Sequence, residues 1–432
     1  MREMKDSGIE WIGKVPTNWK VSKIKYVINK LYSGGTPQSG NSFFYDDNGF
    51  CWVAIGDMST TSFVEDTKSH ITLEGALDKR LKLVKKGTIL YSIYATIGKV
   101  SQLNVDSYIN QAILALYPNK NVNNDFLKYW LISLEDYALS ECSLNIQNNL
   151  NAEKVKNFPY LLTSLNNQQK IVIFLDKKCN EIDSLTSDIK KQIETLQEYK
   201  KSVITEAVTK GLDPNVEMKD SGSIFAGSIP KRYNFIPLKY VVNYNIESLS
   251  EKTPYNYEFD YIDIGSVTYG KGITQLQRLN FRDAPSRARR VVKEGDVILS
   301  TVRTYLKATA FIKEINFPTI VSTGFITLTA KEKINKEYLK YIAQYEGFVS
   351  EVEERSNGVS YPAINSSDVV KIKVPLPPQN DQIQIADYLD NKCSKIDLAI
   401  AEKNKQLETL EQYKKSLIYE YVTGKKEVLS YV

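Results

Sequence analysis

Histidine and cysteine are scarce in this chain of 432 residues, and their scarcity excludes several classes of site. The single histidine, His70, excludes a histidine-rich metal site and argues against a serine–histidine or cysteine–histidine catalytic pair. The four cysteines, Cys51, Cys142, Cys179 and Cys393, are scattered and form no C-x-x-C pair. This spacing is typical of a reducing cytoplasm and predicts no zinc site.

Long apolar runs and a strong charge of one sign are also absent. No run approaches the roughly 18–20 apolar residues of a membrane span. The first six residues carry mixed charge, so we expect neither a membrane helix nor a secretory signal. The net charge is +5, from 56 Lys and Arg against 51 Asp and Glu. That excess is too small to identify a nucleic-acid-binding protein. The composition predicts a folded, cytoplasmic protein of more than one domain.

The chain contains an internal repeat. Residues 166–209 and 380–423 align without a gap at an offset of 214, and 22 of the 44 positions are identical. The same offset relates residues 4–8 to residues 218–222, which both read Met-Lys-Asp-Ser-Gly. The chain therefore consists of two tandem copies of one unit, and each copy is a variable globular part followed by a similar long segment.

The repeated segments are predicted to be long helices because they contain neither glycine nor proline. Apolar residues recur at heptad spacing, as at Leu175, Ile182 and Ile189, so we expect the helices to pack on each other. The variable parts contain short β-branched and aromatic runs, with helical stretches at 126–137 and 336–354, and are predicted to be α+β. We expect domains at 1–165 and 213–378 and long helices within 166–212 and 379–432.

Catalytic motifs are represented only by weak look-alikes. Residues 157–160, Asn-Phe-Pro-Tyr, resemble the Asn/Asp-Pro-Pro-Tyr loop of adenine methyltransferases, but a phenylalanine stands in the second position. The glycine-containing stretch at 33–37 lacks the spacing of a phosphate-binding P-loop. We therefore expect no catalytic residues and no metal ligands in this chain.

Arginine is unevenly placed, since eight of the ten arginines lie between residues 232 and 355. Arginine can donate to guanine edges, and both arginine and lysine can hold phosphate groups. This cluster therefore indicates nucleic-acid contact. A solvated charged face remains the alternative at this point.

Four stretches resemble the specificity subunit of type I restriction–modification systems: residues 7–19, 33–37, 295–303 and 375–390. The resemblance covers essentially the whole chain. It departs in the first copy, where residues 158–167 lack the Pro-Leu-Pro-Pro pattern and residues 92–96 lack the arginine. The resemblance implies two α+β target recognition domains, held apart by an antiparallel coiled coil of the two long helices with pseudo-twofold symmetry.

The resemblance also implies a function. Each domain would read one half of a bipartite, asymmetric site in double-stranded DNA. The exposed faces of the helices would dock two modification (methyltransferase) subunits, because Glu194/Glu408, Lys201/Lys415 and Glu206/Glu420 repeat there. Restriction (translocase/nuclease) subunits would join them. This chain would bind no cofactor, whereas S-adenosylmethionine, ATP and Mg would be bound by the partner subunits. Adenine-N6 methylation and DNA cleavage would then take place on the partners, and this chain would be non-catalytic.

We name candidate DNA-binding residues on this basis. In the first domain they are Thr36, Gln38, Arg80, Tyr94, Lys99, Asn145 and Asn148. In the second they are Arg282, Arg287, Arg289, Arg290, Arg303, Tyr305, Lys307, Ser360 and Tyr361. Two rival functions remain open: an adaptor protein that oligomerises through its helices, and a free-standing methyltransferase or nuclease.

Overall fold

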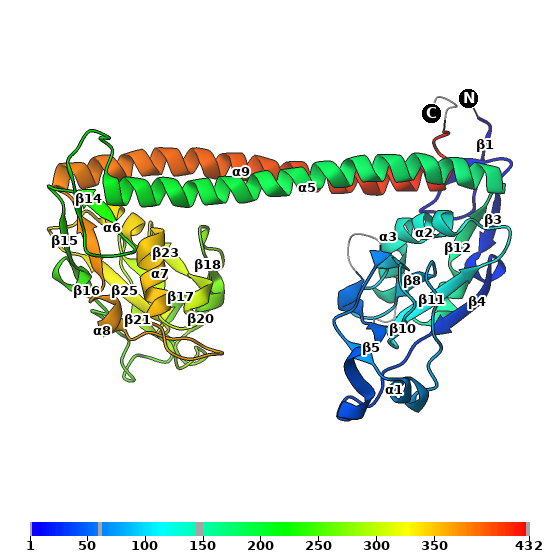
Figure 1. Ribbon diagram of the computed structural model, residues 1–432, viewed down its shortest axis with the longest axis horizontal. Coiled ribbons are helices and arrows are strands. Elements are labelled where there is room, and N and C mark those ends of the chain that lie inside the picture. The colour runs from blue at the N-terminus through cyan, green and yellow to red at the C-terminus, as the bar shows by residue number, and fades with distance from the viewer. Residues whose placement is uncertain (1, 59–62, 144–149, 429–432) are drawn as a thin grey trace. The chain divides into compact units, whose positions relative to one another are not determined.

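The structure is a computed structural model that describes residues 2–58, 63–143 and 150–428. The chain divides into two compact units: unit 1 contains residues 1–189 and 405–432, and unit 2 contains residues 190–404. Each unit combines one globular part with portions of the two long helices α5 (Leu165–Lys210) and α9 (Gln379–Val422) (Figure 1). None of the helices in these described ranges is both long and apolar enough to cross a membrane.

Unit 1 is an α+β unit built around a mixed five-stranded sheet in the order β4-β11-β8-β9-β6. A second sheet has the order β10-β5-β7, and the pairs β12-β3 and β1-β2 complete the unit. Its strands are β1 (Met4–Asp6), β2 (Lys14–Pro16), β3 (Lys20–Lys23), β4 (Ile28–Ser33), β5 (Tyr45–Val53), β6 (Phe63–Val64), β7 (His70–Ile71), β8 (Ile89–Ser92), β9 (Val100–Leu103), β10 (Tyr108–Ile109), β11 (Ile113–Pro118) and β12 (Pro159–Leu162). Its short helices are α1 (Leu73–Asp78), α2 (Asn124–Ser133), α3 (Glu135–Ser143) and α4 (Ala152–Asn157).

Unit 2 repeats this plan with the sheets β16-β25-β22-β23 and β20-β17-β24-β21 and the pairs β15-β26, β13-β14 and β18-β19. Its strands are β13 (Met218–Asp220), β14 (Ser228–Pro230), β15 (Asn234–Pro237), β16 (Val242–Tyr244), β17 (Glu258–Ile262), β18 (Val267–Thr268), β19 (Gly272–Ile273), β20 (Gln277–Asn280), β21 (Ala288–Val291), β22 (Val297–Ser300), β23 (Thr309–Phe311), β24 (Thr319–Ser322), β25 (Phe325–Ala330) and β26 (Lys373–Leu376). Its short helices are α6 (Lys336–Ile342), α7 (Glu346–Glu354) and α8 (Ser366–Val369). The predicted α+β repeat is therefore confirmed in the fold.

The helical stretches predicted at 126–137 and 336–354 are each split into two helices. In unit 1 the chain turns at Leu134 between α2 and α3, and in unit 2 it turns at 343–345 between α6 and α7. Leu134 and Tyr345 are fully or almost fully buried. The turns direct these residues into the core, which a helical sequence pattern does not reveal.

The long helices are antiparallel in unit 1. The rings of Phe174 in α5 and Tyr421 in α9 lie 4.3 Å apart. Farther along α5, Asp183 pairs with Lys414 at 2.6 Å. The residue number rises along α5 while that of its partner falls along α9, so the predicted antiparallel arrangement is confirmed.

The helices are antiparallel in unit 2 by the same test. Lys403 of α9 donates a hydrogen bond to Gln192 of α5, and Lys200 of α5 pairs with Asp397 of α9 at 2.7 Å. Asp397 is the repeat counterpart of Asp183, and Lys200 is the repeat counterpart of Lys414. The same kind of lysine–aspartate ion pair therefore occurs in both units. In unit 1 the lysine comes from α9, and in unit 2 it comes from α5.

A buried glutamine in the first turns of each long helix fastens that helix to the globular part. In unit 1 the side chain of Gln168 is fully buried and accepts a hydrogen bond from Asn123 N at 2.8 Å. Its amide donates to Asn121 O at 3.2 Å and to Thr163 O at 2.9 Å. The side chain thus satisfies two main-chain groups just before α2 and one just before α5.

Unit 2 contains the same arrangement at the repeat position. Gln382 accepts from Asn335 N at 2.8 Å and donates to Lys333 O and Pro377 O. It is 1% exposed. Both glutamines therefore stand at the same place in the fold.

A tyrosine–aspartate contact adds a second attachment point. Tyr129 of α2 donates to Asp176 of α5 at 2.7 Å, and Tyr341 of α6 donates to Asp390 of α9. Burial is the largest cause of the raised pKa of both phenols, with the neighbouring carboxylates adding to it. The phenols stay protonated and keep donating at neutral pH.

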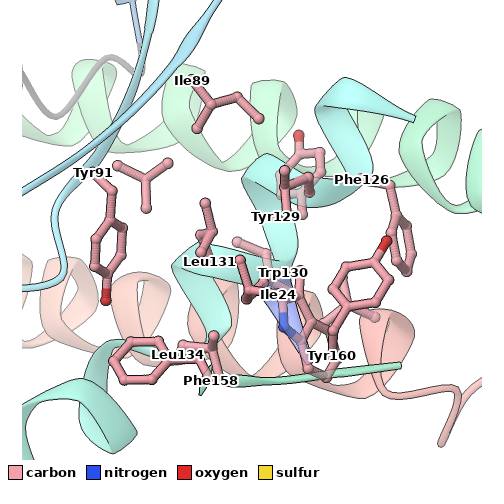
Figure 2. Packing of buried hydrophobic residues seen from close by; sticks show 14 of the residues in the cluster. Ile24, Ile89, Tyr91, Phe126, Tyr129, Trp130, Leu131, Leu134, Phe158 and Tyr160 are labelled. Carbon is pink, nitrogen blue, oxygen red and sulfur yellow. The ribbon is translucent and has the colours of Figure 1, made fainter. Parts of the chain in front are cut away.

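The core of unit 1 is aromatic where the sheet, α2 and the long helices meet. Trp130 and Tyr160 are fully buried, with ring centres 5.4 Å apart in an edge-on contact. Figure 2 shows them beside Ile24 and Phe158, which come from distant parts of the chain. Trp130 Nε1 donates to Pro159 O at 2.8 Å. The same buried cluster contains Ile89 of β8 and Leu175 of α5, so it joins the main sheet to the long helix.

Candidate nucleic-acid interface

A loop of the same plan follows the inner strand of the main sheet in each unit. In unit 1 the loop is residues 93–99 after β8, and Ser92 N donates to Lys99 O at its base. In unit 2 the loop is residues 301–308 after β22, and Ser300 N donates to Ala308 O at its base. We call them the β8 loop and the β22 loop. They occupy equivalent places in the duplicated fold.

Each loop contains two residues in the left-handed backbone region. In the β8 loop they are Ala95, with φ 55°, and Gly98, with φ 83°. In the β22 loop they are Arg303, with φ 51°, and Lys307, with φ 52°. A residue with a side chain pays on the order of 1–3 kcal/mol for this conformation, which occurs preferentially at functional sites. The paired positions mark both loops as functional candidates.

The same two segments hold each loop in place. In unit 1 the first loop residue donates to Ala112 O and accepts from Leu150 N. In unit 2 the first loop residue donates to Gly324 O and accepts from Ile364 N. The loop, the turn before β11 or β25 and the segment before α4 or α8 therefore form one framework in each unit.

Five predicted residues gather on the unit 2 framework. The β22 loop and the segment before α8 supply Arg303, Tyr305, Lys307, Ser360 and Tyr361. The Arg303 guanidinium lies 5.1 Å from the centre of the Tyr361 ring. Lys307 pairs with Glu353 of α7 at 3.1 Å. Tyr305 is 53% exposed and Tyr361 67% exposed. An arginine and an aromatic ring thus lie together at the surface of this framework, and Tyr305 is exposed in the same loop; these residue types suit phosphate and base contacts.

Two of the other four arginines are exposed. Arg287 adjoins the framework, since its carbonyl accepts from Thr323 N at 2.8 Å, next to the residue that holds the β22 loop. Arg282 is exposed just after β20. Both guanidinium groups face solvent, where DNA could reach them.

The remaining two arginines are half-buried in β21. The Arg289 guanidinium lies 4.7 Å from the centre of the Phe281 ring and donates to Ala288 O. The Nε of Arg290 is buried and has no hydrogen-bond partner in the described part of the chain. Burial lowers the pKa of Arg290 below the ordinary value for arginine.

The unit 1 candidates are less concentrated. Tyr94, 37% exposed, and half-buried Lys99 belong to the β8 loop. Thr36 donates to Gln111, which lies in the turn that holds this loop. Gln38 is exposed two residues farther on.

Arg80 is exposed at the end of α1 with φ 50°. A Cβ at Gly35 would lie 3.0 Å from the Leu81 side chain, so the chain beside Arg80 approaches the chain beside Thr36. Asn145 and Asn148 lie outside the described residues.

Sequence reasoning missed two residues of these surfaces. Gln111 is a polar side chain in a short turn between two buried strands, and that position was the available signal. Val359 is fully exposed beside the candidate Ser360. A hydrophobic residue in a turn gives no sequence signal for exposure, because only the folded chain decides which way it points.

The catalytic look-alikes have structural roles. Asn157 ends α4, while Phe158 and Tyr160 are buried and the latter pairs with Ser22 across β12 and β3. A Cβ at Gly34 would lie 1.9 Å from Ile109 O, so close main-chain packing requires this glycine. Neither stretch forms an open substrate or phosphate site.

Comparison with known proteins decides the family. The model of the type I restriction modification DNA specificity domain matches twice, over residues 16–195 and 230–409. The chain belongs to this family. Type I specificity subunits are DNA-recognition components and not catalysts, so the predicted non-catalytic role is confirmed. The two matched copies agree with the repeat in the sequence and the fold.

Relatives cover nearly the whole chain. The type I restriction enzyme MjaVIII specificity subunit of Methanocaldococcus jannaschii is 26% identical over 437 aligned residues, 96% of this chain and 94% of its own length. The EcoR124I/EcoR124II specificity subunit of Escherichia coli is 26% identical over 39% of this chain and 43% of its own length. A chain from a structural study of type I R-M complex assembly has a TM-score of 0.68 at 14% identity, covering 95% of this chain and 99% of its own. That last likeness concerns the fold.

Proposed function

We propose that this specificity subunit reads a bipartite, asymmetric site in double-stranded DNA, with one half-site contacted by each recognition domain. The observation that supports this is the repeated loop framework, which occurs once per unit. Two recognition domains in one chain also raise the effective concentration of the second contact once the first has formed.

The side chains on the two frameworks differ, which supports two different half-sites. The left-handed residue at the third position of the loop is Ala95 in unit 1 and Arg303 in unit 2. An arginine can donate two hydrogen bonds to a guanine edge, whereas an alanine offers only a methyl group. We therefore assign more arginine-based readout to unit 2.

The long helices are the proposed docking surface for two modification subunits. Among the residues that recur at the repeat offset and are exposed in both copies, five pairs lie within the stretches 191–199 and 405–413. They are Lys191 and Lys405, Gln192 and Gln406, Glu194 and Glu408, Thr195 and Thr409, and Tyr199 and Tyr413. Identical surface residues in both copies support two identical partners. Gln192 accepts a hydrogen bond from Lys403 within unit 2, and the repeated residues Lys201 and Lys415 pair with Glu198 and Glu135 within their own units.

Restriction subunits complete the proposed complex. S-adenosylmethionine, ATP and Mg bind the partner subunits, so methylation and cleavage take place there. The proposed location is the cytoplasm, where the DNA is.

DNA binding is tested with the target defined first. Methylated adenines in the source genome give the recognised sequence, and a duplex carrying it is titrated with the subunit and its modification partners. Duplexes altered in one half-site each should both bind more weakly, by about 1–3 kcal/mol per changed base pair. Equal affinity for all three duplexes would refute the assignment.

Partner docking is tested by stoichiometry. Tyr199→Ala and Tyr413→Ala should each reduce the co-purified ratio from two modification subunits per chain to one, and the double variant should bind none. Leu398→Ser is the matched control, because Leu398 is 69% exposed on α9 but its repeat counterpart is Ser184. If the tyrosine variants keep two partners, this face is not the docking surface.

A further inference from the structure

The chain's single histidine meets one of its four cysteines in unit 1. His70 of β7 lies directly opposite Cys51 of β5 in the antiparallel pairing. Asp66, from the segment before β7, completes the group, and one ligand-type atom from each residue lies within 4.8 Å of the other two. Strand β5, the segment before β7 and β7 itself thus bring a thiol, a carboxylate and an imidazole close together.

The spacing of these atoms fits a tetrahedral metal ion. Cys51 Sγ lies 3.6 Å and His70 Nε2 lies 3.1 Å from the same carboxylate oxygen of Asp66. Zinc bonds of about 2.0–2.3 Å place neighbouring tetrahedral ligands about 3.3–3.6 Å apart. The His70 side chain is 17% exposed and that of Asp66 78% exposed, so solvent can supply a fourth ligand.

The equivalent place in unit 2 carries a different cross-strand link. Asp260 of β17 lies opposite Arg278 of β20, just as Cys51 of β5 lies opposite His70 of β7. The strands β5 and β17 are equivalent, because each also pairs in parallel with a third strand. Arg278 donates two hydrogen bonds to Asp260, at 2.9 and 3.0 Å. The fold therefore joins these two strands by a polar link in both units, and unit 1 has metal-binding residue types where unit 2 has an ion pair.

We propose that Cys51, Asp66 and His70 bind one zinc ion, which joins β5 to β7 in the first recognition domain. A thiolate, an imidazole and a carboxylate form a set that suits Zn²⁺. The Cys51 thiol releases its proton to the buffer on binding, and a water molecule occupies the fourth position. Cysteine spacing along the sequence gave no indication of this site because the ligands come from a strand, a loop and the next strand.

The test uses the full chain without an added histidine tag, stripped with a chelator and titrated with zinc against a chromophoric competitor. One equivalent should bind. Cobalt in place of zinc should give a thiolate-to-metal charge-transfer band. Cys51→Ser, His70→Asn and Asp66→Asn should each weaken zinc binding more than the loss of a residue that only supports a metal ligand does. Such a loss lowers metal affinity by roughly 10-fold to 100-fold. Asp106→Asn, at an exposed carboxylate of unit 1 outside the group, should leave zinc affinity unchanged.

A second variant separates metal binding from folding. Cys51→Asp combined with His70→Arg installs the ion pair of unit 2 at the same cross-strand position. This variant should fold with an unchanged far-ultraviolet circular dichroism spectrum but bind no zinc, and zinc should raise the unfolding temperature of the wild type alone. The proposal is overturned if the wild type binds no zinc, or if the single variants and this double variant bind it as the wild type does. The three residues are then only a hydrogen-bonded cluster.

Discussion

Replacement of Gln168 by leucine should destabilise unit 1 by about 2–4 kcal/mol. The side chain is fully buried and makes three hydrogen bonds to main-chain groups. Leucine has a similar volume but leaves one main-chain N–H and two carbonyls without these partners. A net loss of about 1 kcal/mol per bond gives about 3 kcal/mol, and the favourable burial of leucine offsets part of any further desolvation cost.

Tryptophan fluorescence gives this prediction a selective assay. All four tryptophans, Trp11, Trp19, Trp52 and Trp130, lie in unit 1. Urea unfolding followed by fluorescence therefore reports on unit 1, while far-ultraviolet circular dichroism reports on the whole chain. Gln168→Leu should lower the midpoint of the fluorescence transition with an unchanged slope. Gln382→Leu, at the repeat position in unit 2, should lower the dichroism transition more than the fluorescence transition.

The control is Gln197→Leu, at an exposed position of α5. It should change stability by no more than about 0.5 kcal/mol. If Gln168→Leu costs no more than this control, the glutamine does not fasten the helix, and the argument from its three hydrogen bonds is wrong. If Gln382→Leu shifts the fluorescence transition as strongly as Gln168→Leu does, the two glutamines do not act within their own units.

Arg303→Ala should weaken binding of the true DNA site by about 1–3 kcal/mol and relax specificity at one base pair of the second half-site, measured by fluorescence anisotropy with single-base variants. Alanine substitution of Arg282, Arg287, Arg289 and Arg290 should separate base-reading arginines from phosphate-binding ones, because loss of a phosphate contact weakens binding of all sequences alike. If all five variants discriminate between bases as the wild type does, the assignment is contradicted. Arg278→Ala is the control, because Arg278 is held by Asp260 and lies 3.9 Å from the centre of the Phe317 ring, and it should leave DNA affinity unchanged. Exchanging the charges of Lys414 and Asp183, or of Lys200 and Asp397, should restore most of the stability lost in the single charge reversals. A double-mutant cycle should give a coupling energy of about 0.5–1 kcal/mol. A coupling energy of zero would show that the ion pair does not stabilise the helix pair.

The duplication could be predicted from sequence alone because it is written as an ungapped repeat. Residues 166–209 and 380–423 lack the two residue types that end helices, so long helices followed directly from local backbone preferences. The family resemblance then supplied the antiparallel arrangement, and pairs such as Phe174 with Tyr421 confirm it within unit 1. These features depend on local or repeated information, which a single sequence contains.

Only the tertiary structure decided which residues meet. Cys51 and His70 are 19 positions apart and become neighbours because β5 and β7 pair in one register. Arg303 meets Tyr361 because the β22 loop and the segment before α8 hydrogen-bond to each other. The sequence did place an arginine cluster in the second copy, but it could not separate exposed Arg287 from half-buried Arg290. Strand register and loop conformation depend on contacts between distant segments, and those contacts exist only once the chain has folded.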